Sequence, residues 1–442
     1  MLLLWWIGCG GSTASGERHP EATSSRLSSV LARCRATSNR LRVRCQVEVE
    51  PPQPVRLEWW PTDGSAPPRA IEDDAPEAVH RLTLSMLPAN REHKYRVVLP
   101  EDPQATSRGT FWTGRPPTGV GSWLDVRGEG DGLLGTEMPC GDRAVAVIYD
   151  AVTGDLVWYQ DLDPDGTLGM VDMVRFTERG TVAGETGGEV VEVDTDGRDL
   201  VRFEADGLHH DLLAEPGGFV SLVQERVGLQ WIDRVVGYAL DGTPTLWWVP
   251  EEHLAPWPSN RGDVLHTNAV ARLPDGGMLL SWYAVSTVAA VDADGEIAWL
   301  LAGDGDEGPV GNDVTVDWSG IDGPHDFSGQ HDVHLTRDGR LVMLDDHHGR
   351  GLVLTVDAED GVATVDGAYP TAEATCGGQG TATDTPDGEI LVACPTDRLR
   401  AYDEASGELH WEARIGCRNG RAGWATRWYA LDPQVWIDGM EE

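Results

Sequence analysis

The sequence predicts an all-β protein in which a six-bladed β-propeller follows a small N-terminal β-sandwich. The first observation is a repeated unit of short strands, P-D-G-type turns and a segment of the form D-x-x-G-x-x-x-W. The second is an alternation of apolar and polar residues, with period two, between residues 31 and 113. The third is the composition, which has 53 Gly and 18 Trp but only 5 Phe.

Residues 31–115 are expected to form the sandwich. Alternating stretches such as "LRVRCQVEVE" and "VRLEWWP" predict strands, and turn clusters such as "PTDGSAPP" separate them. The stretch "LTLSMLPANREHKYRVVL" resembles the latter half of a fibronectin type III-like sandwich, with Tyr95 near its corner. The segment "FWTGRPPTG" closes this domain and links it to the next one.

Residues 116–442 are expected to form the propeller. The segments "YDAVTGDLVWYQDL", "VDADGEIAWLLAG" and "YDEASGELHWEARI" end three of the repeats. The six units begin near residues 120, 164, 207, 263, 327 and 376. Short four-stranded units that recur at a fixed period are typical of a β-propeller. The C-terminal segment is expected to close the ring or to pack beneath it.

Residues 1–30 are interpreted as a leader and a polar tether. The apolar run "MLLLWWIGC" resembles the lipobox of bacterial lipoproteins, which implies that Cys9 carries the lipid. We therefore expect an exported protein, lipid-anchored in the periplasm or at the outer membrane of a bacterium. No other apolar stretch approaches the length of a membrane-spanning helix.

Cysteine usage agrees with export. Apart from Cys9 the cysteines are even in number, which suggests disulfides in an oxidising compartment, although six cysteines allow about fifteen connectivities. The favoured pairs, the first two across hairpins, are Cys34–Cys45, Cys376–Cys394 and Cys140–Cys417. The third pair would tie the first and last propeller segments together. The alternative is buried free thiols.

The net charge of −39 argues against a nucleic-acid partner, because binding to phosphates needs clustered Lys and Arg. The chain has 34 basic residues against 73 acidic ones. An anionic substrate would therefore need a local cationic or histidine-lined pocket that offsets the overall field.

Three histidines stand at the starts of the first strands of consecutive units. They are His210 in "LHHDLL", His266 in "LHTNAV" and His331 in "GQHDVHL". First strands line the central channel of a propeller, so these side chains are expected to converge there. Imidazole can act as a nucleophile, a general base or a metal ligand. Asp211 and Asp332 are expected to face sideways and to orient a neighbour.

These motifs, together with "VLHTNAVARLPDGGMLLSWYAVSTVAAVDADGEIAWLLAG", resemble the bacterial aryl-sulfate sulfotransferases over roughly residues 120 to 420. The resemblance implies that a sulfuryl group moves from an aryl sulfate to a phenol through a sulfohistidine, without a nucleotide sulfate donor or any cofactor. It implies small-molecule partners, and contact with a membrane only through the lipid anchor. A homodimer is left open.

The resemblance also assigns roles residue by residue. His331 is the nucleophile, and His266 with Asn268 binds the sulfuryl group or the leaving oxygen. His210 assists, with His209 as the alternative if the register shifts by one residue. No metal ligand is expected.

The sequence departs from the family pattern at two places. The family carries an arginine that clamps the sulfate two residues after the position of Ser281, and this chain has Tyr283 there. A tyrosine offers a hydrogen bond but no charge. Arg350 is the candidate replacement, from the next blade. The family's F-D-N segment is changed to "LDD" at residues 344–346.

Three further histidines and three rival functions remain. His334 is expected to pack between sheets, and His347 and His348 are expected at the channel rim or in a solvated turn. The first rival is a non-catalytic propeller that serves as a tethered binding or scaffold module. The others are a quinoprotein-like dehydrogenase and a metal-dependent propeller enzyme.

Overall fold

The computed structural model describes residues 28–100, 102–137, 139–141, 144–163, 171–254, 262–303 and 311–437. Regular structure in these residues consists of strands β1 to β33, three short 3-10 turns and one short helix, α1 (Pro433–Ile437). The prediction of an all-β protein is therefore confirmed. No helix within these ranges has the length and hydropathy needed to cross a membrane. The predicted leader and Cys9 lie outside the described residues.

Two N-terminal sheets pack face to face. One contains β1 (Ser29–Ala36), β2 (Val43–Glu50) and β5 (Val79–Leu84), and the other contains β4 (Arg69–Asp73), β3 (Val55–Pro61), β6 (Glu92–Leu99) and β7 (Asp102–Trp112). Side chains alternate between buried and exposed along β2, so one face of that sheet forms the core. The hydroxyl of Tyr95 on β6 donates to the carbonyl of Ala32 at 3.0 Å and joins the two sheets.

Six further sheets follow, each with four antiparallel strands at its centre. The first sheet contains β11 (Leu156–Asp161), β10 (Val145–Asp150), β9 (Leu133–Glu137) and β33 (Trp428–Leu431), and the second contains β12 (Val171–Phe176), β13 (Val182–Thr186), β14 (Glu189–Val193) and β15 (Asp199–Glu204). The third contains β16 (Leu208–Glu215), β17 (Gly218–Val227), β18 (Gln230–Ala239) and β19 (Pro244–Trp248), and the fourth contains β20 (Thr267–Arg272), β21 (Met278–Trp282), β22 (Thr287–Val291) and β23 (Ile297–Ala302). The fifth contains β25 (His331–Leu335), β26 (Leu341–Asp345), β27 (Arg350–Asp357) and β28 (Val362–Pro370), and the sixth contains β29 (Thr381–Asp384), β30 (Glu389–Ala393), β31 (Arg398–Asp403) and β32 (Leu409–Cys417).

Two of these sheets gain a fifth strand. β24 (Thr315–Asp317) adds to β28, and β8 (Ser122–Gly128) adds to β32. The sequence placed the start of the first repeat near residue 120, but the strand that begins there extends the last sheet. The first sheet takes its inner strand from β33, at the C-terminal end of the chain.

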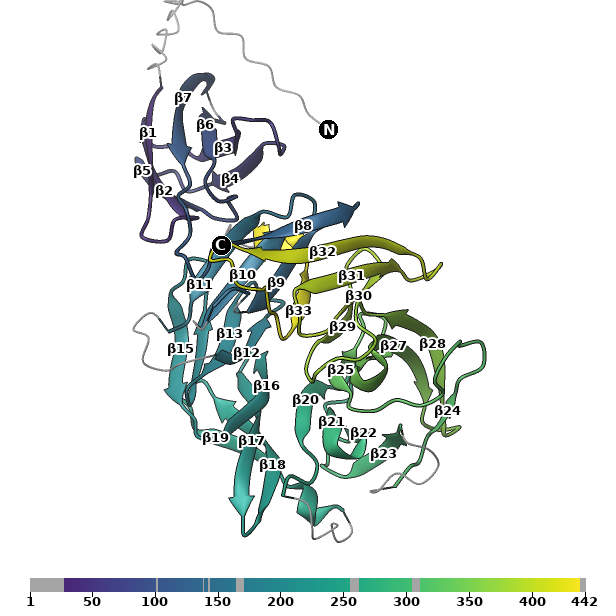
Figure 1. Cartoon of the computed structure of the whole chain (residues 1–442). Helices are drawn as coiled ribbons and strands as arrows, with labels where there is room; N and C mark the ends of the chain where they lie inside the picture. The colour runs from purple at the N-terminus through teal and green to yellow at the C-terminus, as the bar shows by residue number, and fades with distance from the viewer. Residues whose placement is uncertain are drawn as a thin grey trace, which may run out of the picture.

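The inner strands form a closed series. β12, β16, β20, β25, β29 and β33 contact one another in that order, and β12 also contacts β9 of the sheet that contains β33. Figure 1 shows these strands towards the middle of the molecule, with β15, β19 and β23 towards its periphery. The C-terminal segment thus closes the ring, which is one of the two expected arrangements, and residues distant in sequence meet at the centre of the ring.

The three favoured disulfides are all present. Cys34 pairs with Cys45, Cys376 with Cys394, and Cys140 with Cys417. The last bond joins residues 277 positions apart and lies where β32 ends beside the first sheet. It therefore reinforces the closure that β33 makes by strand pairing.

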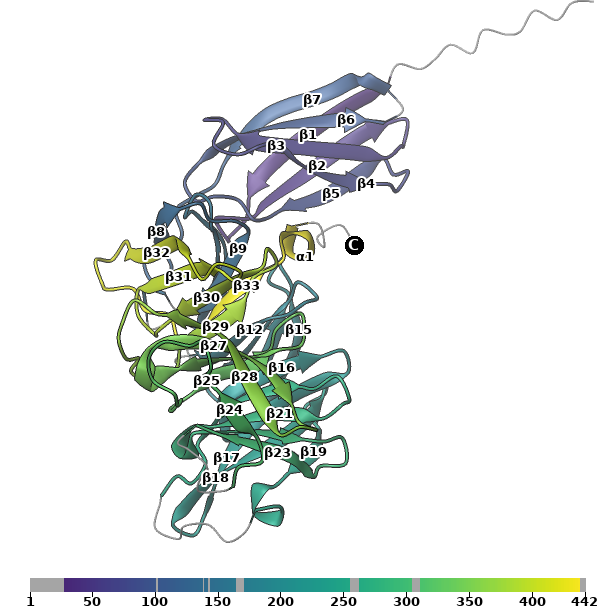
Figure 2. The same cartoon turned by 90° about the vertical axis from the view of Figure 1, so that its right-hand side faces the viewer.

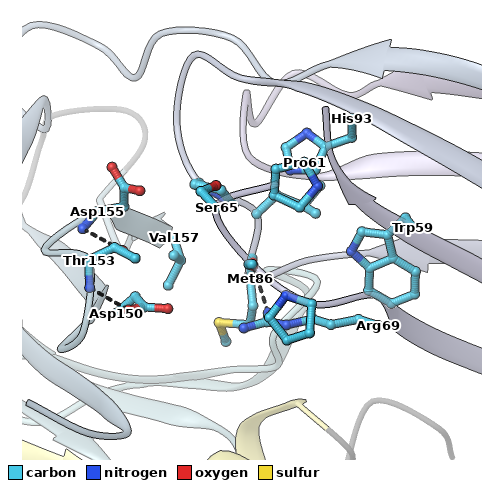
Figure 3. A pocket seen from close by; sticks show the side chains of 14 residues that line it. Trp59, Pro61, Ser65, Arg69, Met86, His93, Asp150, Thr153, Asp155 and Val157 are labelled. Carbon is cyan, nitrogen blue, oxygen red and sulfur yellow. Dashed lines mark hydrogen bonds between the residues drawn. The ribbon is translucent and has the colours of Figure 1, made fainter. Parts of the chain in front are cut away.

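The N-terminal sheets lie at the end of the ring near β8 and β9 (Figure 2), and a polar contact connects them to the first sheet of the ring. The guanidinium of Arg91 binds Asp63 at 2.9 Å and Asp155 at 2.6 Å. Figure 3 shows a pocket at this junction, whose labelled residues are Trp59, Pro61, Ser65, Arg69, Met86, His93, Asp150, Thr153, Asp155 and Val157. None of the histidines predicted to act in catalysis lines this pocket.

Candidate functional site

The three histidines predicted to converge do so at the centre of the ring. Nε2 of His210 lies 2.9 Å from Nε2 of His266. The ring centroids of His210 and His331 are 6.5 Å apart. These side chains come from three neighbouring inner strands, so residues more than 100 positions apart in the sequence form one cluster.

The three histidines do not occupy one equivalent strand position, which corrects the sequence alignment. His331 pairs with Leu344 on the neighbouring strand. Leu344 lies three residues after Leu341, which forms the pair nearest the hairpin turn. In the two preceding sheets, the pairs at the same distance from the hairpin turn are formed by Leu212 and Ala269. His210 and His266 precede those pairs and reach the centre by a different local backbone path.

Left-handed backbone conformations produce this path. His210 has a φ of 62°, His266 of 51° and Asp332 of 54°. The strand pairing is interrupted at each place, between Leu208 and Leu212, Thr267 and Ala269, and His331 and His334. A positive φ is uncommon for residues other than glycine, and such strain gathers at functional sites. The three bulges turn the histidines towards one another.

His331 is held by one hydrogen bond and lies against one buried carboxylate. Its Nδ1 donates to the carbonyl of Gly329 at 3.1 Å and lies 2.9 Å from Oδ2 of Asp346. The His331 side chain is only 6% exposed and that of Asp346 only 1%. Burial raises the pKa of Asp346, and the contact with His331 opposes that shift. With the proton on Nδ1, Nε2 of His331 carries the lone pair.

Two of the other histidines also have a carboxylate behind them. Nδ1 of His266 lies 2.6 Å from Oδ2 of Asp263, and Nδ1 of His209 lies 3.4 Å from Oδ1 of Asp233. The hydrogen bond with Asp263 raises the pKa of His266. His210 behaves in the opposite way: burial, followed by the three neighbouring histidines, lowers its pKa to about 2. His210 is therefore neutral and resists protonation, and its ring nitrogens remain uncharged.

A small pocket lies beside His331 and His210. It is lined by Met173, His210, Asn268, His331, Gln379, Gly380, Thr426 and Arg427. The amide nitrogen of Asn268 donates to the carbonyl of Gln330 at 2.8 Å, which fixes the backbone next to His331. The amide oxygen of Asn268 is buried without a protein partner among the described residues.

Arg427 supplies the permanent positive charge at this pocket. It is buried, with its guanidinium 3.1 Å from Asp211 and 3.1 Å from Asp332. Arg175 forms a second ion pair with Asp211 at 2.7 Å. Burial lowers the pKa of Arg427, but Asp332 and Asp211 outweigh that effect and keep it well above its ordinary value. As predicted, Asp211 and Asp332 orient neighbours rather than face the histidines.

Tyr283 lies between two of the histidines. Its ring centroid is 5.3 Å from that of His266 and 5.1 Å from that of His331. Tyr283 begins a 3-10 turn, η2 (Tyr283–Val285), directly after β21. The residue that replaces the family arginine therefore stands beside the expected nucleophile and adds no charge there.

Arg350 is placed away from this cluster. Its Nε is 3.0 Å from Asp345, and its Nη2 donates to the carbonyl of Asp326 at 2.6 Å. Its guanidinium lies over the ring of Trp318, 5.2 Å from the centroid. In the described part of the chain no contact joins Arg350 to the converging histidines, so its expected role as the replacement cation gains no support.

The remaining histidines of the 327–351 stretch lie where the sequence predicted. His334 contacts the carbonyl of Asp332 at 2.7 Å and the hydroxyl of Thr383, on the next sheet, at 3.2 Å. It therefore packs between two sheets. His347 and His348 belong to the turn η3 (Asp346–His348) after β26, where His347 is exposed.

Sequence reasoning missed three kinds of residue at the site. Asp346 was noted only as a departure from the family pattern, although it follows directly on the strand that pairs with His331. Asp263 stands three residues before His266, a spacing that could have indicated a supporting carboxylate. Nothing in the sequence indicated that Arg427 belongs to the site, because it lies in a C-terminal segment that no motif connects to the histidines.

Comparison with known proteins gives one family match. Residues 253–416 match the family model described as arylsulfotransferase (ASST). No curated protein matches the chain. The matched range contains His266, Asn268, Tyr283 and His331, whereas His209, His210 and Arg427 lie outside it.

Solved structures similar to this chain share little sequence with it. A protein of unknown function from Bacteroides caccae is 11% identical, with 68% of this chain and 98% of that chain covered and a TM-score of 0.43. A virginiamycin B lyase from Staphylococcus aureus is 10% identical, with 66% and 99% covered and a TM-score of 0.35. BamB from Moraxella catarrhalis is 11% identical, with 72% and 82% covered and a TM-score of 0.32. Residues 253–416, with His266, Asn268 and His331 among them, match the arylsulfotransferase (ASST) family that the motifs in the sequence resemble.

Proposed function

We propose that this protein transfers a sulfuryl group from an aryl sulfate to a phenol, with His331 as the residue that carries the group. The observation that carries the proposal is the environment of His331. Its Nδ1 faces the carbonyl of Gly329 and the carboxylate of Asp346, so the lone pair lies on Nε2. A histidine held in one tautomer beside a pocket is prepared to act as a nucleophile.

In the first half of the reaction, Nε2 of His331 attacks the sulfur of the aryl sulfate. A bond forms between nitrogen and sulfur, and the bond between sulfur and the aryl oxygen breaks. The electron pair of that bond stays on the oxygen, which leaves as a phenolate or, after it takes up a proton, as a phenol. Asp346 stabilises the positive charge that develops on the imidazole ring.

In the second half, the oxygen of an acceptor phenol attacks the sulfur. The bond between Nε2 of His331 and sulfur breaks, the electron pair returns to nitrogen, and the phenolic proton passes to a base. His210 is a poor candidate for this base, because burial lowers its pKa to about 2, and water takes the proton instead. The enzyme thereby returns to its starting state without a nucleotide donor.

Donors around the pocket stabilise the sulfuryl oxygens as negative charge shifts onto the leaving group. Arg427 contributes a positive charge from the C-terminal segment. Its ion pairs with Asp211 and Asp332 also hold the bulged strands that carry His210 and His331. The guanidinium thus supports the geometry of the site even where carboxylates offset its charge.

The architecture that we infer is a six-bladed β-propeller preceded by a fibronectin type III-like sandwich. The closed series of inner strands supports the propeller, and the three-stranded and four-stranded N-terminal sheets support the sandwich. The boundary near residues 115 and 116 falls between β7 and β8. Export and lipid anchoring at Cys9 belong to the same proposal, since an exported protein can keep its disulfides.

The test uses 4-nitrophenyl sulfate as donor and phenol as acceptor, with release of 4-nitrophenolate as the signal. Release that depends on phenol, and that is lost in H331A, supports sulfuryl transfer. The control is H325A, because His325 is exposed and, among the described residues, interacts with the carbonyl of Ile321 and the ring of Trp318. Release without dependence on phenol would indicate hydrolysis. No turnover by the folded protein would favour the non-catalytic module.

A further inference from the structure

Three imidazole groups cluster next to the His331 pocket, and one of them, that of His210, also lines it. One ring nitrogen from each of His209, His210 and His266 lies within 4.8 Å of the others. The closest pair, the Nε2 atoms of His210 and His266, is 2.9 Å apart. Two nitrogens bound to one zinc ion at ~2.0–2.1 Å lie about 2.9–3.4 Å from each other, so this spacing suits joint coordination.

Carboxylates lie behind two of the three rings, and the one behind His266 forms a hydrogen bond with it. Asp263 faces Nδ1 of His266 at 2.6 Å, and Asp233 faces Nδ1 of His209 at 3.4 Å. Asp233 is itself held, because it accepts hydrogen bonds from the backbone of Thr267 at 2.6 Å and from Gln224 at 3.1 Å. Histidines that bind metals commonly have such a carboxylate behind the ring, which fixes the orientation of the metal-binding nitrogen.

In the part of the chain that the structure describes, no protein cation balances the charges at this place. Among the described residues, no Arg or Lys contacts Asp233 or Asp263. The contrast within the same ring is clear, since Asp211 is paired with both Arg175 and Arg427. One divalent cation between the histidines would offset the two carboxylates.

We propose that a divalent transition-metal ion, for which zinc is the reference case, binds between His209, His210 and His266. Imidazole ligands suit zinc, copper, nickel and iron, and three protein ligands leave a position open for a substrate oxygen. The three proposed ligands are not the same as the three histidines with proposed catalytic roles. His209 is a ligand here, and His331 is not.

The ion would act on the leaving oxygen, and this role rests on the proposed sulfuryl transfer. The family arginine is replaced here by Tyr283, which stands between His266 and His331 and carries no charge. As Nε2 of His331 bonds to sulfur and the bond from sulfur to the aryl oxygen breaks, the electron pair stays on that oxygen. The ion binds the phenolate until a proton from solvent replaces it.

The experiment measures binding of zinc and of cobalt(II) to the full chain, first freed of metal with a chelator. The expected result is one ion per chain, with cobalt(II) showing the visible absorption of a nitrogen-coordinated site. H209N and D233N should each weaken binding about 10–100-fold. H325N, a change at an exposed histidine, should leave the affinity unchanged. No binding, or equal affinity in wild type and H209N, overturns the site.

Transfer assays of the same samples separate this inference from the proposed function. Transfer that falls at least about tenfold in metal-free protein and returns with zinc supports the role of the ion. Transfer that is unaffected by removal of the metal overturns that role and leaves the proposed function intact. Zinc bound with the expected H209N dependence, but without any transfer, supports the site while it overturns the proposed function.

Discussion

Nδ1 of His331 lies 2.9 Å from Oδ2 of Asp346, and both side chains are almost completely buried. His331 begins β25, and Asp346 follows the last residue of β26, so the hairpin itself brings the two residues together. A carboxylate in this position selects the tautomer with its proton on Nδ1 and stabilises the ring when it becomes positively charged. This pair supports the proposal that His331 is the nucleophile of the site.

Replacement of Asp346 by Asn should lower kcat about 10–100-fold with little change in KM. The amide keeps the shape of the carboxylate but cannot stabilise a positively charged imidazole. Steady-state kinetics with 4-nitrophenyl sulfate and phenol give both parameters. D326N is the matched control, because Asp326 is a half-exposed carboxylate of the same region that lies 3.5 Å from His348. An equal fall in both variants would contradict the role of Asp346.

Replacement of Tyr283 by Arg should restore the fixed charge of the family pattern. The guanidinium would stand beside His266 and His331, where it attracts the sulfate and repels a metal ion bound to His266. We expect a lower KM for the donor, about tenfold weaker zinc binding, and transfer that persists in the presence of a chelator. Y283F is the control and should show none of these changes. Unchanged KM and unchanged zinc affinity in Y283R would contradict the account of this position.

The fold was more accessible to sequence reasoning than the site. Period-two alternation and recurring turns predict short strands because burial on one face has the same periodicity as the strand. The strand at 122–128 was assigned to the wrong sheet, because it pairs with β32 from the far end of the repeat region. Such pairing depends on ring closure and leaves no local pattern.

Convergence of the histidines could be predicted from their place near the starts of inner strands, but their geometry could not. The positive φ values of His210 and His266 decide where the rings point, and nothing in the residue types requires them. Arg427 reaches the pocket only because β33 joins the first sheet. Contacts made by the tertiary fold, rather than by neighbours in sequence, determine both features.

The stability of the protein should depend on the pH through Glu137. Burial raises the pKa of this carboxyl to about 7, although it accepts a hydrogen bond from the backbone of Arg427 at 2.9 Å. The folded protein therefore holds a proton that the unfolded chain loses near its ordinary pKa of 4.5. The free energy of unfolding should fall as the pH rises from 4.5 through 7, by about 3 kcal/mol from this group.

Urea unfolding between pH 5 and 8 tests this dependence. E137Q mimics the protonated carboxyl, so its free energy of unfolding should exceed that of wild type increasingly as the pH rises. E178Q, at an exposed turn position, should follow wild type at every pH. A constant difference between E137Q and wild type over this range would show that Glu137 does not retain its proton.

The disulfide that closes the ring should stabilise the protein more than the local one. Cys140 and Cys417 are 277 positions apart, whereas Cys376 and Cys394 are only 18 apart. Because a crosslink restricts the unfolded chain more when its loop is longer, C140S/C417S should lose about 2 kcal/mol more than C376S/C394S. Urea unfolding of both double variants without reductant measures this difference. Equal losses would indicate that strand pairing by β33 holds the ring closed by itself.

The most direct test of the central claim is to trap the intermediate. The protein is mixed rapidly with 4-nitrophenyl sulfate in the absence of an acceptor, and the digested chain is examined by mass spectrometry. The account predicts a burst of about one nitrophenolate per chain and one sulfuryl group on the peptide that contains His331. The adduct should be absent in H331A, present in H325A and discharged by phenol. A sulfuryl group on another residue, or transfer without any adduct, would contradict the claim that His331 carries the group.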